Sequence, residues 1–175
     1  MLLGLCGSLR ADSLNKKLMR EAARLYGGPF EEANLRLPLY DGDLEDQDGV
    51  PAAVSALSDQ IKSAEAVLVV TPEYNQSFSG VLKNALDWVS RTKGGPWRDK
   101  PVALMSAAAG RAGGARAAYA LRLAMTPFRP HLLAGPEILV AGAQNEFDET
   151  GTLTNDRYIA QLTELMDDLK AAATD

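Results

Sequence analysis

The sequence predicts an α/β fold in which five parallel strands form one doubly wound sheet with helices on both faces. Short apolar runs alternate with segments of helical period along the whole chain, which is the pattern of repeated strand–helix units. The 175 residues suit one hydrophobic core, since single domains usually hold roughly 100–200 residues. Hydrophobic residues make up 46% of the chain and charged residues 23%, so a core and a solvated surface can both form. We therefore expect residues 1–175 to form a single domain.

The first strand is expected at Leu2–Cys6, a short apolar run typical of a buried strand. A helix should follow it and end at the glycines and proline of residues 27–29, which interrupt helical geometry. Its apolar face is predicted from four residues at helical spacing: Leu14, Leu18, Ala22 and Leu25.

The second strand is expected at Ala33–Leu37, and the polar residues 38–50 are expected to form a surface loop. Pro51 should then open a helix, because proline suits the first helical turn. Ala66–Thr71 has an unbroken β-branched character that predicts a central strand buried on both faces.

The second half of the chain continues the alternation. Residues 81–89 predict an amphipathic helix, Pro101–Ser106 the fourth strand, and Arg116–Met125 another helix. The fifth strand is expected near Glu137–Ala141. The chain should close with a helix over residues 159–169, capped by Asn155 or Asp156.

Five such units with right-handed crossovers can be arranged in few ways. The flavodoxin-like order 2-1-3-4-5, a three-layer sandwich, is one of the two common solutions. In that order the ligand binds beyond the carboxyl ends of the strands, between the first and third strands. The loops after these two strands are therefore the expected functional loops.

The overall composition argues against several classes of partner. A net charge of −5 without a basic run does not suit a nucleic-acid or anionic membrane surface. The apolar stretches are much shorter than the roughly 20 residues that cross a bilayer, so no membrane insertion is expected. A single cysteine, Cys6, and a start without a secretory pattern favour the cytoplasm. The lone His131 lacks companions for a metal site.

The loop after the first strand, residues 7–15, predicts a phosphate site. It places hydroxyl, amide and guanidinium groups beside the start of a helix, where free N–H groups attract anions. The side chains concerned are those of Ser8, Arg10, Ser13 and Asn15. Equally, Ser13 could merely cap the helix while Arg10 is simply solvated. No dinucleotide glycine motif or P-loop occurs, so a mononucleotide fits better.

The loop after the third strand, residues 71–80, contains Tyr74 and Phe78 at the expected switch point. Its rings and backbone N–H groups could stack on and bond a flat heteroaromatic ring. On composition alone, the two rings could instead cover the core or a subunit surface.

Together these motifs closely resemble the NADPH-dependent FMN reductases, a group that includes quinone, chromate and azo-dye reductases. The resemblance lies in Gly7-Ser8-Leu9-Arg10 with Ser13 and Asn15, and in Thr71-Pro72-Glu73-Tyr74-Asn75 followed by Leu82-Lys83-Asn84-Ala85-Leu86-Asp87-Trp88. It extends over essentially the whole chain, with supporting matches at residues 37–40, 113–116 and 147–151.

The resemblance implies a cofactor, a donor and a set of contacts. FMN would be the cofactor, NADPH or NADH the donor, and a small molecule such as a quinone the acceptor. The FMN phosphate would be held by Ser8, Arg10, Ser13 and Asn15. The isoalloxazine would lie along Pro72, Glu73, Tyr74 and Asn75, with Ser106 and Gly110 in the loop that closes its other edge. Relatives of this kind form homodimers or homotetramers, and Trp88, Trp97 and Tyr119 could form an interface patch or be buried within the monomer.

The sequence departs from the family pattern in three places. Asp12 lies in the phosphate loop, where its charge opposes an anion. Ser79 replaces a frequent proline and can cap the following helix instead. Ala107–Gly110 lacks hydroxyl groups, so its flavin contacts would have to come from backbone N–H groups.

Two other functions remain open from the sequence. A flavodoxin-type electron carrier would bind FMN without oxidising NAD(P)H itself. A sensory or scaffold domain would keep the fold without binding FMN.

Overall fold

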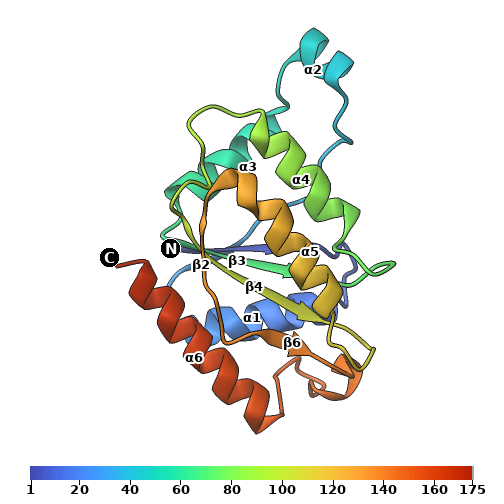
Figure 1. Ribbon diagram of the computed structural model, residues 1–175, viewed down its shortest axis with the longest axis vertical. Helices are drawn as coiled ribbons and strands as arrows, with labels where there is room; N and C mark the ends of the chain where they lie inside the picture. Colours follow the sequence, from blue (N-terminus) through green and yellow to red (C-terminus); the bar gives the residue numbers. More distant parts are fainter. Residues whose placement is uncertain (175) are drawn as a thin grey trace.

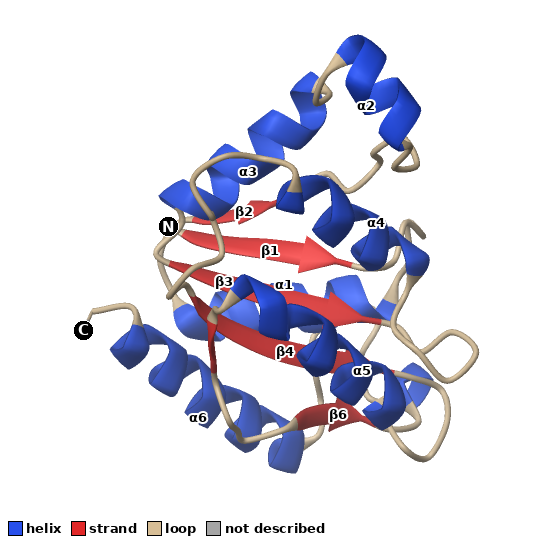
Figure 2. Ribbon diagram, turned by 45° about the horizontal axis from the view of Figure 1, so that its top comes forward, coloured by secondary structure: helices blue, strands red, loops and turns tan. Residues whose placement is uncertain are grey.

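The computed structural model describes residues 1–174 and has a parallel sheet at its centre (Figures 1 and 2). The strand order is β2-β1-β3-β4-β5, and β6 also pairs with β4, every pair being parallel. The predicted order 2-1-3-4-5 is confirmed. The strands are β1 (Leu2–Cys6), β2 (Phe30–Glu32), β3 (Ala66–Thr71), β4 (Pro101–Ala107), β5 (His131–Leu132) and β6 (Ile138–Val140).

The fifth position of the sheet is occupied by two short strands instead of one. His131 of β5 pairs with Pro101 at the start of β4, and Ile138 of β6 pairs with Met105 near its end. The predicted strand near Glu137–Ala141 corresponds to β6, whereas β5 was not predicted. Pro136 lies between the two strands and has no N–H group to donate to a ladder, which is consistent with the interruption.

The prediction for the second strand was wrong by three residues. β2 begins at Phe30, opposite Leu2, and its last ladder contact is the Ala33 N–H donating to the Gly4 carbonyl at 2.9 Å. Ala33 and Leu35 are buried at alternate positions, as in a strand, although β2 has already ended at Glu32. The alternation of buried residues, which the sequence pattern reveals, therefore begins three residues after the hydrogen-bonded strand begins.

The predicted surface loop over residues 38–50 contains a helix, α2 (Gly42–Asp48). Asp41 caps it by accepting a hydrogen bond from the Asp43 N–H. None of its residues is buried, and it projects from the sandwich at the top of Figure 1. A helix without an apolar face gives no periodic signal, so the sequence pattern could not predict it.

Helices cover both faces of the sheet and divide the core in two. α1 (Leu14–Tyr26) and α6 (Asp156–Ala172) pack on one face, and α3 (Ala52–Ser63), α4 (Gly80–Ser90) and α5 (Ala115–Met125) on the other (Figure 2). The central strand β3 is buried throughout and supplies alternate side chains to the two cores. Leu68 and Val70 face α1 and α6, while Val67 and Val69 face the opposite helices.

The predicted helix caps are formed by side chains. The Ser13 hydroxyl accepts from the Lys16 N–H at 3.4 Å, and the Ser79 hydroxyl accepts from the Leu82 N–H at 3.3 Å. Asn155, and not Asp156, caps α6 by accepting from two N–H groups of its first turn. The start of α4 is therefore preserved without the proline that relatives often carry there.

The proposed aromatic interface patch does not form, because Trp88 and Trp97 are each only 2% exposed within the monomer. The Trp88 indole donates to the Pro38 carbonyl at 2.8 Å, and its ring meets that of Tyr40 edge to face. Tyr119 alone of the three aromatic residues is exposed.

The lone histidine and cysteine occupy different surroundings. His131 is exposed, whereas Cys6 is buried, and burial raises the pKa of its thiol. Among residues 1–174, no three His, Cys, Asp or Glu side chains gather as metal ligands do, and no helix is long and apolar enough to span a membrane.

Candidate functional site

A cavity of about 540 Å³ opens beyond the carboxyl ends of β1, β3 and β4, at the predicted switch point. Its walls come from three loops, one after each of these strands, together with the start of α1 and the turn after β6. The lining residues are Ser8, Arg10, Asp12, Ser13, Leu14, Asn15, Lys17, Pro72, Glu73, Tyr74, Ala107, Ala108, Ala109 and Gln144.

The loop after β1 forms the charged wall. A Cβ atom on Gly7 would lie 2.5 Å from the Ser79 hydroxyl and 2.8 Å from a methyl group of Leu82, so only glycine lets this loop approach α4 closely. The Arg10 guanidinium makes no hydrogen bond or ion pair within the described chain. The Lys16 and Lys17 N–H groups are taken by Ser13, whereas the Leu14 and Asn15 N–H groups at the start of α1 have no acceptor within the described chain and so add donors to this wall.

Asp12 is compensated by a residue that the sequence reasoning did not predict. Lys17 lies one turn into α1, and its ammonium is 2.8 Å from the Asp12 carboxylate. The hydrogen bond to Lys17 lowers the pKa of Asp12, which is fully exposed. Because Lys17 lines the same cavity four residues after Ser13, helical spacing from the cap was the available signal.

Asn15 lines the cavity but is already hydrogen-bonded. Its side chain is 4% exposed, its amide nitrogen donates to the Ala107 carbonyl at 2.9 Å, and its amide oxygen accepts from the Ala107 N–H at 2.9 Å. This pair joins the start of α1 to the end of β4. Asn15 therefore positions two walls of the cavity relative to each other.

The loop after β3 forms the second wall and includes a tight reversal. Tyr74 and Ser77 exchange backbone hydrogen bonds of 2.9 and 3.1 Å, and the residues between them, Asn75 and Gln76, have φ values of 49° and 66°. Tyr74 is half exposed and lines the cavity, whereas Asn75, at the tip of the reversal, does not. Phe78 packs against the core, as the structural alternative for this ring predicted.

Glu73 brings a buried acceptor without a donor to this wall. Its Oε2 atom is buried and has no hydrogen-bond partner in the structure, and its Oε1 atom lies 4.0 Å from the Arg116 guanidinium. Buried polar atoms are nearly always paired in native proteins. Within the described chain, however, this carboxylate oxygen is left without a donor.

Ser106 and Gly110, which the family resemblance places beside the flavin, are not among the residues that line the cavity. Ser106 is fully buried, and its hydroxyl donates to the Thr71 carbonyl at 2.7 Å. The carbonyl of Gly110 instead accepts from the N–H groups of Gly113 and Gly142. Both residues therefore hold the loop through hydrogen bonds within the protein, away from the cavity.

Three alanines line the cavity at the end of β4 and in the loop that follows it. The Ala107 N–H is taken by Asn15 and the Ala108 N–H by the Val140 carbonyl. Ala109 is the member of this trio whose N–H has no acceptor within the described chain. Gln144, in the short helix η2 (Ala143–Asn145) after β6, completes the wall and was not predicted, because η2 is too short to give a periodic signal.

The comparisons with known proteins agree with this geometry. A sequence model of the NADPH-dependent FMN reductases matches residues 1–145. The chain belongs to this family. Within it, the chain is 44% identical over 158 residues to an NAD(P)H-dependent FMN reductase of Pseudomonas aeruginosa, covering 89% of this chain and 85% of that protein. It is 38% identical over 164 residues to a quinone reductase of Escherichia coli K12, covering 91% and 87%.

A solved structure extends the family likeness to three dimensions. The flavoenzyme NAD(P)H:(acceptor) oxidoreductase of Paracoccus denitrificans superimposes with a TM-score of 0.88 at 32% identity, covering 99% of this chain and 96% of that one. The family resemblance and the flavodoxin-like fold that the sequence predicted are thereby confirmed.

Proposed function

We propose that this protein binds FMN in the cavity at the switch point and uses it to transfer electrons from NAD(P)H to a small acceptor such as a quinone. The observation that carries the proposal is an unpaired arginine, Arg10, beside the Ser8 and Ser13 hydroxyls and the start of α1, in a chain of the FMN reductase family. This is the donor set that a phosphate monoester requires.

The cavity fits FMN in size and in chemistry. Its volume of about 540 Å³ lies within the usual range for cofactor sites, roughly 300–1,000 Å³. One end gathers cationic and hydroxyl groups, and the other is formed by backbone and by the Tyr74 ring. The unpaired Glu73 carboxylate oxygen can accept from a hydroxyl or ring N–H group that the cofactor brings.

At the phosphate end, Arg10 can give two parallel hydrogen bonds, and Ser8 and Ser13 can each donate one. Lys17 neutralises Asp12, so the acidic departure from the family pattern adds little repulsion. The dipole of α1 favours the same anion. Asn15 acts indirectly by fixing the helix start against the end of β4.

At the ring end, the backbone of Pro72 to Tyr74 and the loop of three alanines form opposite walls. When bound, FMN would supply the hydride-transfer and electron-transfer chemistry that connects oxidation of the nicotinamide to reduction of the acceptor. The protein binds and orients these molecules. The free Ala109 N–H can stabilise negative charge that develops on a bound ring. Asn75 remains a candidate contact through its backbone only.

Visible spectroscopy and turnover test this proposal. Purified protein should be yellow and should oxidise NADPH or NADH when a quinone is added, with ping-pong kinetics because donor and acceptor use one site in turn. A yellow protein whose flavin neither nucleotide reduces would identify an electron carrier. A colourless protein that takes up no added FMN would identify a non-redox domain.

Homo-oligomerisation, as a dimer or tetramer, is part of the proposal. Tyr119 and Leu123 are 53% and 75% exposed on α5, and Leu39 is 80% exposed before α2, so apolar area is available for association. Sedimentation equilibrium distinguishes the two oligomeric states from a monomer. A cytoplasmic location remains an expectation from the sequence.

A further inference from the structure

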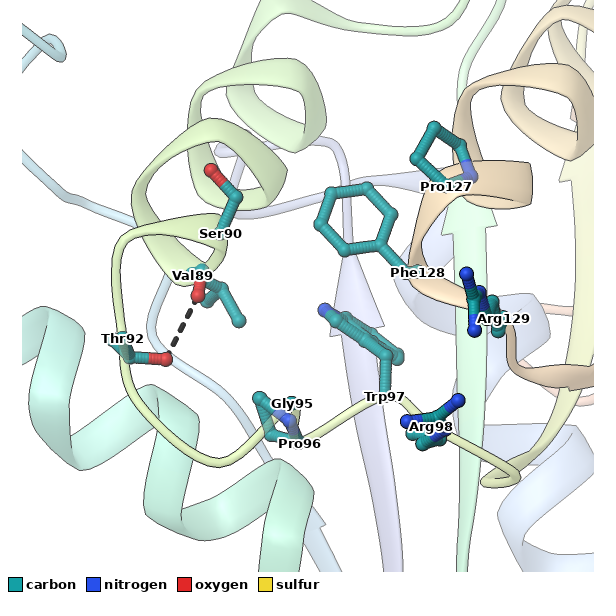
Figure 3. Close-up of a pocket in the computed structure, with 10 residues that line it drawn as sticks. All are labelled: Val89, Ser90, Thr92, Gly95, Pro96, Trp97, Arg98, Pro127, Phe128 and Arg129. Carbon is teal, nitrogen blue, oxygen red and sulfur yellow. Dashed lines mark hydrogen bonds between the residues drawn. The ribbon is translucent and has the colours of Figure 1, made fainter.

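A second cavity, of about 500 Å³, lies at the opposite end of the sheet from the proposed FMN site. Figure 3 shows the residues that line it. It is formed by the end of α4, the connection that leads into the start of β4, and the short helix η1 (Thr126–Phe128). Its position at the amino ends of the strands separates it from the FMN cavity at their carboxyl ends. Neither the family likeness nor the proposed reaction assigns it a role.

Two arginines on one side of this cavity lack partners. The guanidinium groups of Arg98 and Arg129 make no ion pair or hydrogen bond within residues 1–174. Other arginines of the chain, such as Arg24 and Arg91, pair with glutamates. In Figure 3, Arg98 and Arg129 lie across the cavity from Ser90 and Thr92.

The backbone holds Arg129 at this position in a conformation that side chains rarely adopt. Its φ is 55°, in the left-handed region, and its carbonyl accepts from the Asp99 N–H at 3.0 Å. Such a conformation is uncommon in a non-glycine residue, and residues of this kind cluster at ligand sites. The same hydrogen bond ties the segments that carry the two arginines together.

A buried donor without an acceptor supplies an independent observation. The Trp97 side chain is 2% exposed, and its indole N–H has no hydrogen-bond partner in the described chain. Figure 3 shows this nitrogen turned toward the middle of the group of lining residues, between Val89 and Phe128. By contrast, the indole N–H of Trp88, the second tryptophan, is satisfied by the Pro38 carbonyl.

Apart from Ser90 and Thr92, the side chains that line the rest of the cavity are mostly apolar, which restricts the ligand class. Phe128, Pro96, Pro127 and Val89 surround the indole ring. An aromatic ring can pack against these side chains, while a planar carboxylate matches the two-pronged geometry of arginine. A polyphosphate would need more cations than this cavity offers, and a neutral ring would leave both arginines unpaired.

From these contacts we propose that the cavity binds a small aromatic carboxylate. Its carboxylate bonds Arg98 and Arg129, its ring packs against Phe128 and the prolines, and a carboxylate oxygen or ring substituent that reaches the floor accepts from the Trp97 N–H. The proposal does not depend on the redox activity, because the two cavities lie at opposite ends of the sheet.

Nuclear magnetic resonance of ¹⁵N-labelled protein saturated with FMN tests the proposal with benzoate as the probe. The two tryptophans give two indole N–H signals, which the Trp97→Phe variant assigns. Benzoate should shift the Trp97 signal saturably and leave the Trp88 signal in place. Benzamide, the neutral analogue, should bind at least about ten-fold more weakly, because a charge-assisted bond is lost.

Three substitutions that each remove one positive charge complete the test. Arg98→Gln and Arg129→Asn should each raise the Kd for benzoate roughly ten-fold, and asparagine tolerates the positive φ of residue 129. The matched control is Arg157→Gln, at an exposed arginine of α6 that does not line the cavity, and it should leave the Kd unchanged.

Three results would overturn the proposal: no saturable shift, equal binding of benzamide, or a Kd that the two cavity variants do not change. A Trp97 signal that responds to protein concentration and not to benzoate would assign the face to a second copy instead. That outcome would also contradict a small-molecule site.

Discussion

Substituting Asn15 by alanine should destabilise the protein before it affects any bound ligand. The side chain is 4% exposed and makes two hydrogen bonds of 2.9 Å to the N–H and carbonyl groups of Ala107. Asn15→Ala leaves both backbone groups buried without partners. Each such loss costs about 1–3 kcal/mol, so the free energy of unfolding should fall by about 2–6 kcal/mol. That is a large part of the roughly 5–15 kcal/mol available to a typical domain.

Urea unfolding of the FMN-free protein, followed by circular dichroism, measures this change without a contribution from cofactor binding. The free energy of unfolding should fall while its dependence on urea concentration stays constant, because the folded and unfolded surfaces hardly change. Asn145→Ala is a matched control, since that side chain makes no hydrogen bond in the structure. A loss below about 1 kcal/mol for Asn15→Ala would refute the positioning role.

A second substitution of the same residue, Asn15→Asp, separates positioning from direct phosphate binding. If Asn15 mainly holds Ala107, Asn15→Asp should also destabilise the apoprotein, because it retains the acceptor for the Ala107 N–H but offers no donor to the Ala107 carbonyl. A variant that unfolds normally yet binds FMN poorly would instead support the direct contact that the family resemblance implied.

The other predictions concern ligand binding and pH. Arg10→Ala should weaken FMN binding by about 1.5–3 kcal/mol, on the scale of a charge-assisted bond, while Arg157→Ala should not; flavin fluorescence titration measures both, and equal affinities would contradict the phosphate role. Burial, followed by a hydrogen bond to Glu65, raises the pKa of Tyr26 from its ordinary value of 10.0 to about 12. Because the folded state keeps this phenol protonated, its contribution is fully present below pH 10 and is lost as the pH rises toward 12. Tyr26→Phe should therefore lose about 1 kcal/mol less stability between pH 9 and pH 11 than the unmodified protein, and equal losses in urea unfolding would refute this reasoning.

The fold could be predicted where one signal dominated. Ala66–Thr71 is apolar at nearly every position because helices cover both faces of this strand, and that pattern predicts a buried strand. The capping residues Ser13 and Ser79 mark the starts of α1 and α4. The errors lie where the buried residues and the hydrogen-bonded strand residues are not the same. Ala33 and Leu35 are buried without belonging to a strand, and the fifth position of the sheet is divided between β6, which was predicted, and the two-residue β5, which is too short to give a periodic signal.

The candidate site shows the same division. Residues that closely follow the end of a strand, such as Ser8 and Pro72, could be placed from the strand positions alone, and both line the cavity. Residues whose role depends on a distant partner could not be distinguished by type. Asn15 and Ser106 carry the polar groups expected of a cofactor site, but Asn15 is hydrogen-bonded to Ala107 and Ser106 to Thr71.

These two hydrogen-bonded contacts explain how the loop after β4, which has no hydroxyl groups, could still contact a cofactor. A Cβ atom on Gly114 would lie 1.9 Å from the Ser106 hydroxyl, so the return of the chain into α5 requires glycine directly above the Ser106–Thr71 bond. Asn15 fixes the other side of the same loop through Ala107. With both sides fixed, Ala109 is held at the cavity with its N–H free. In the proposed FMN site we therefore expect the backbone to be the binding group of this wall, while the polar side chains of Asn15 and Ser106 hold it in position.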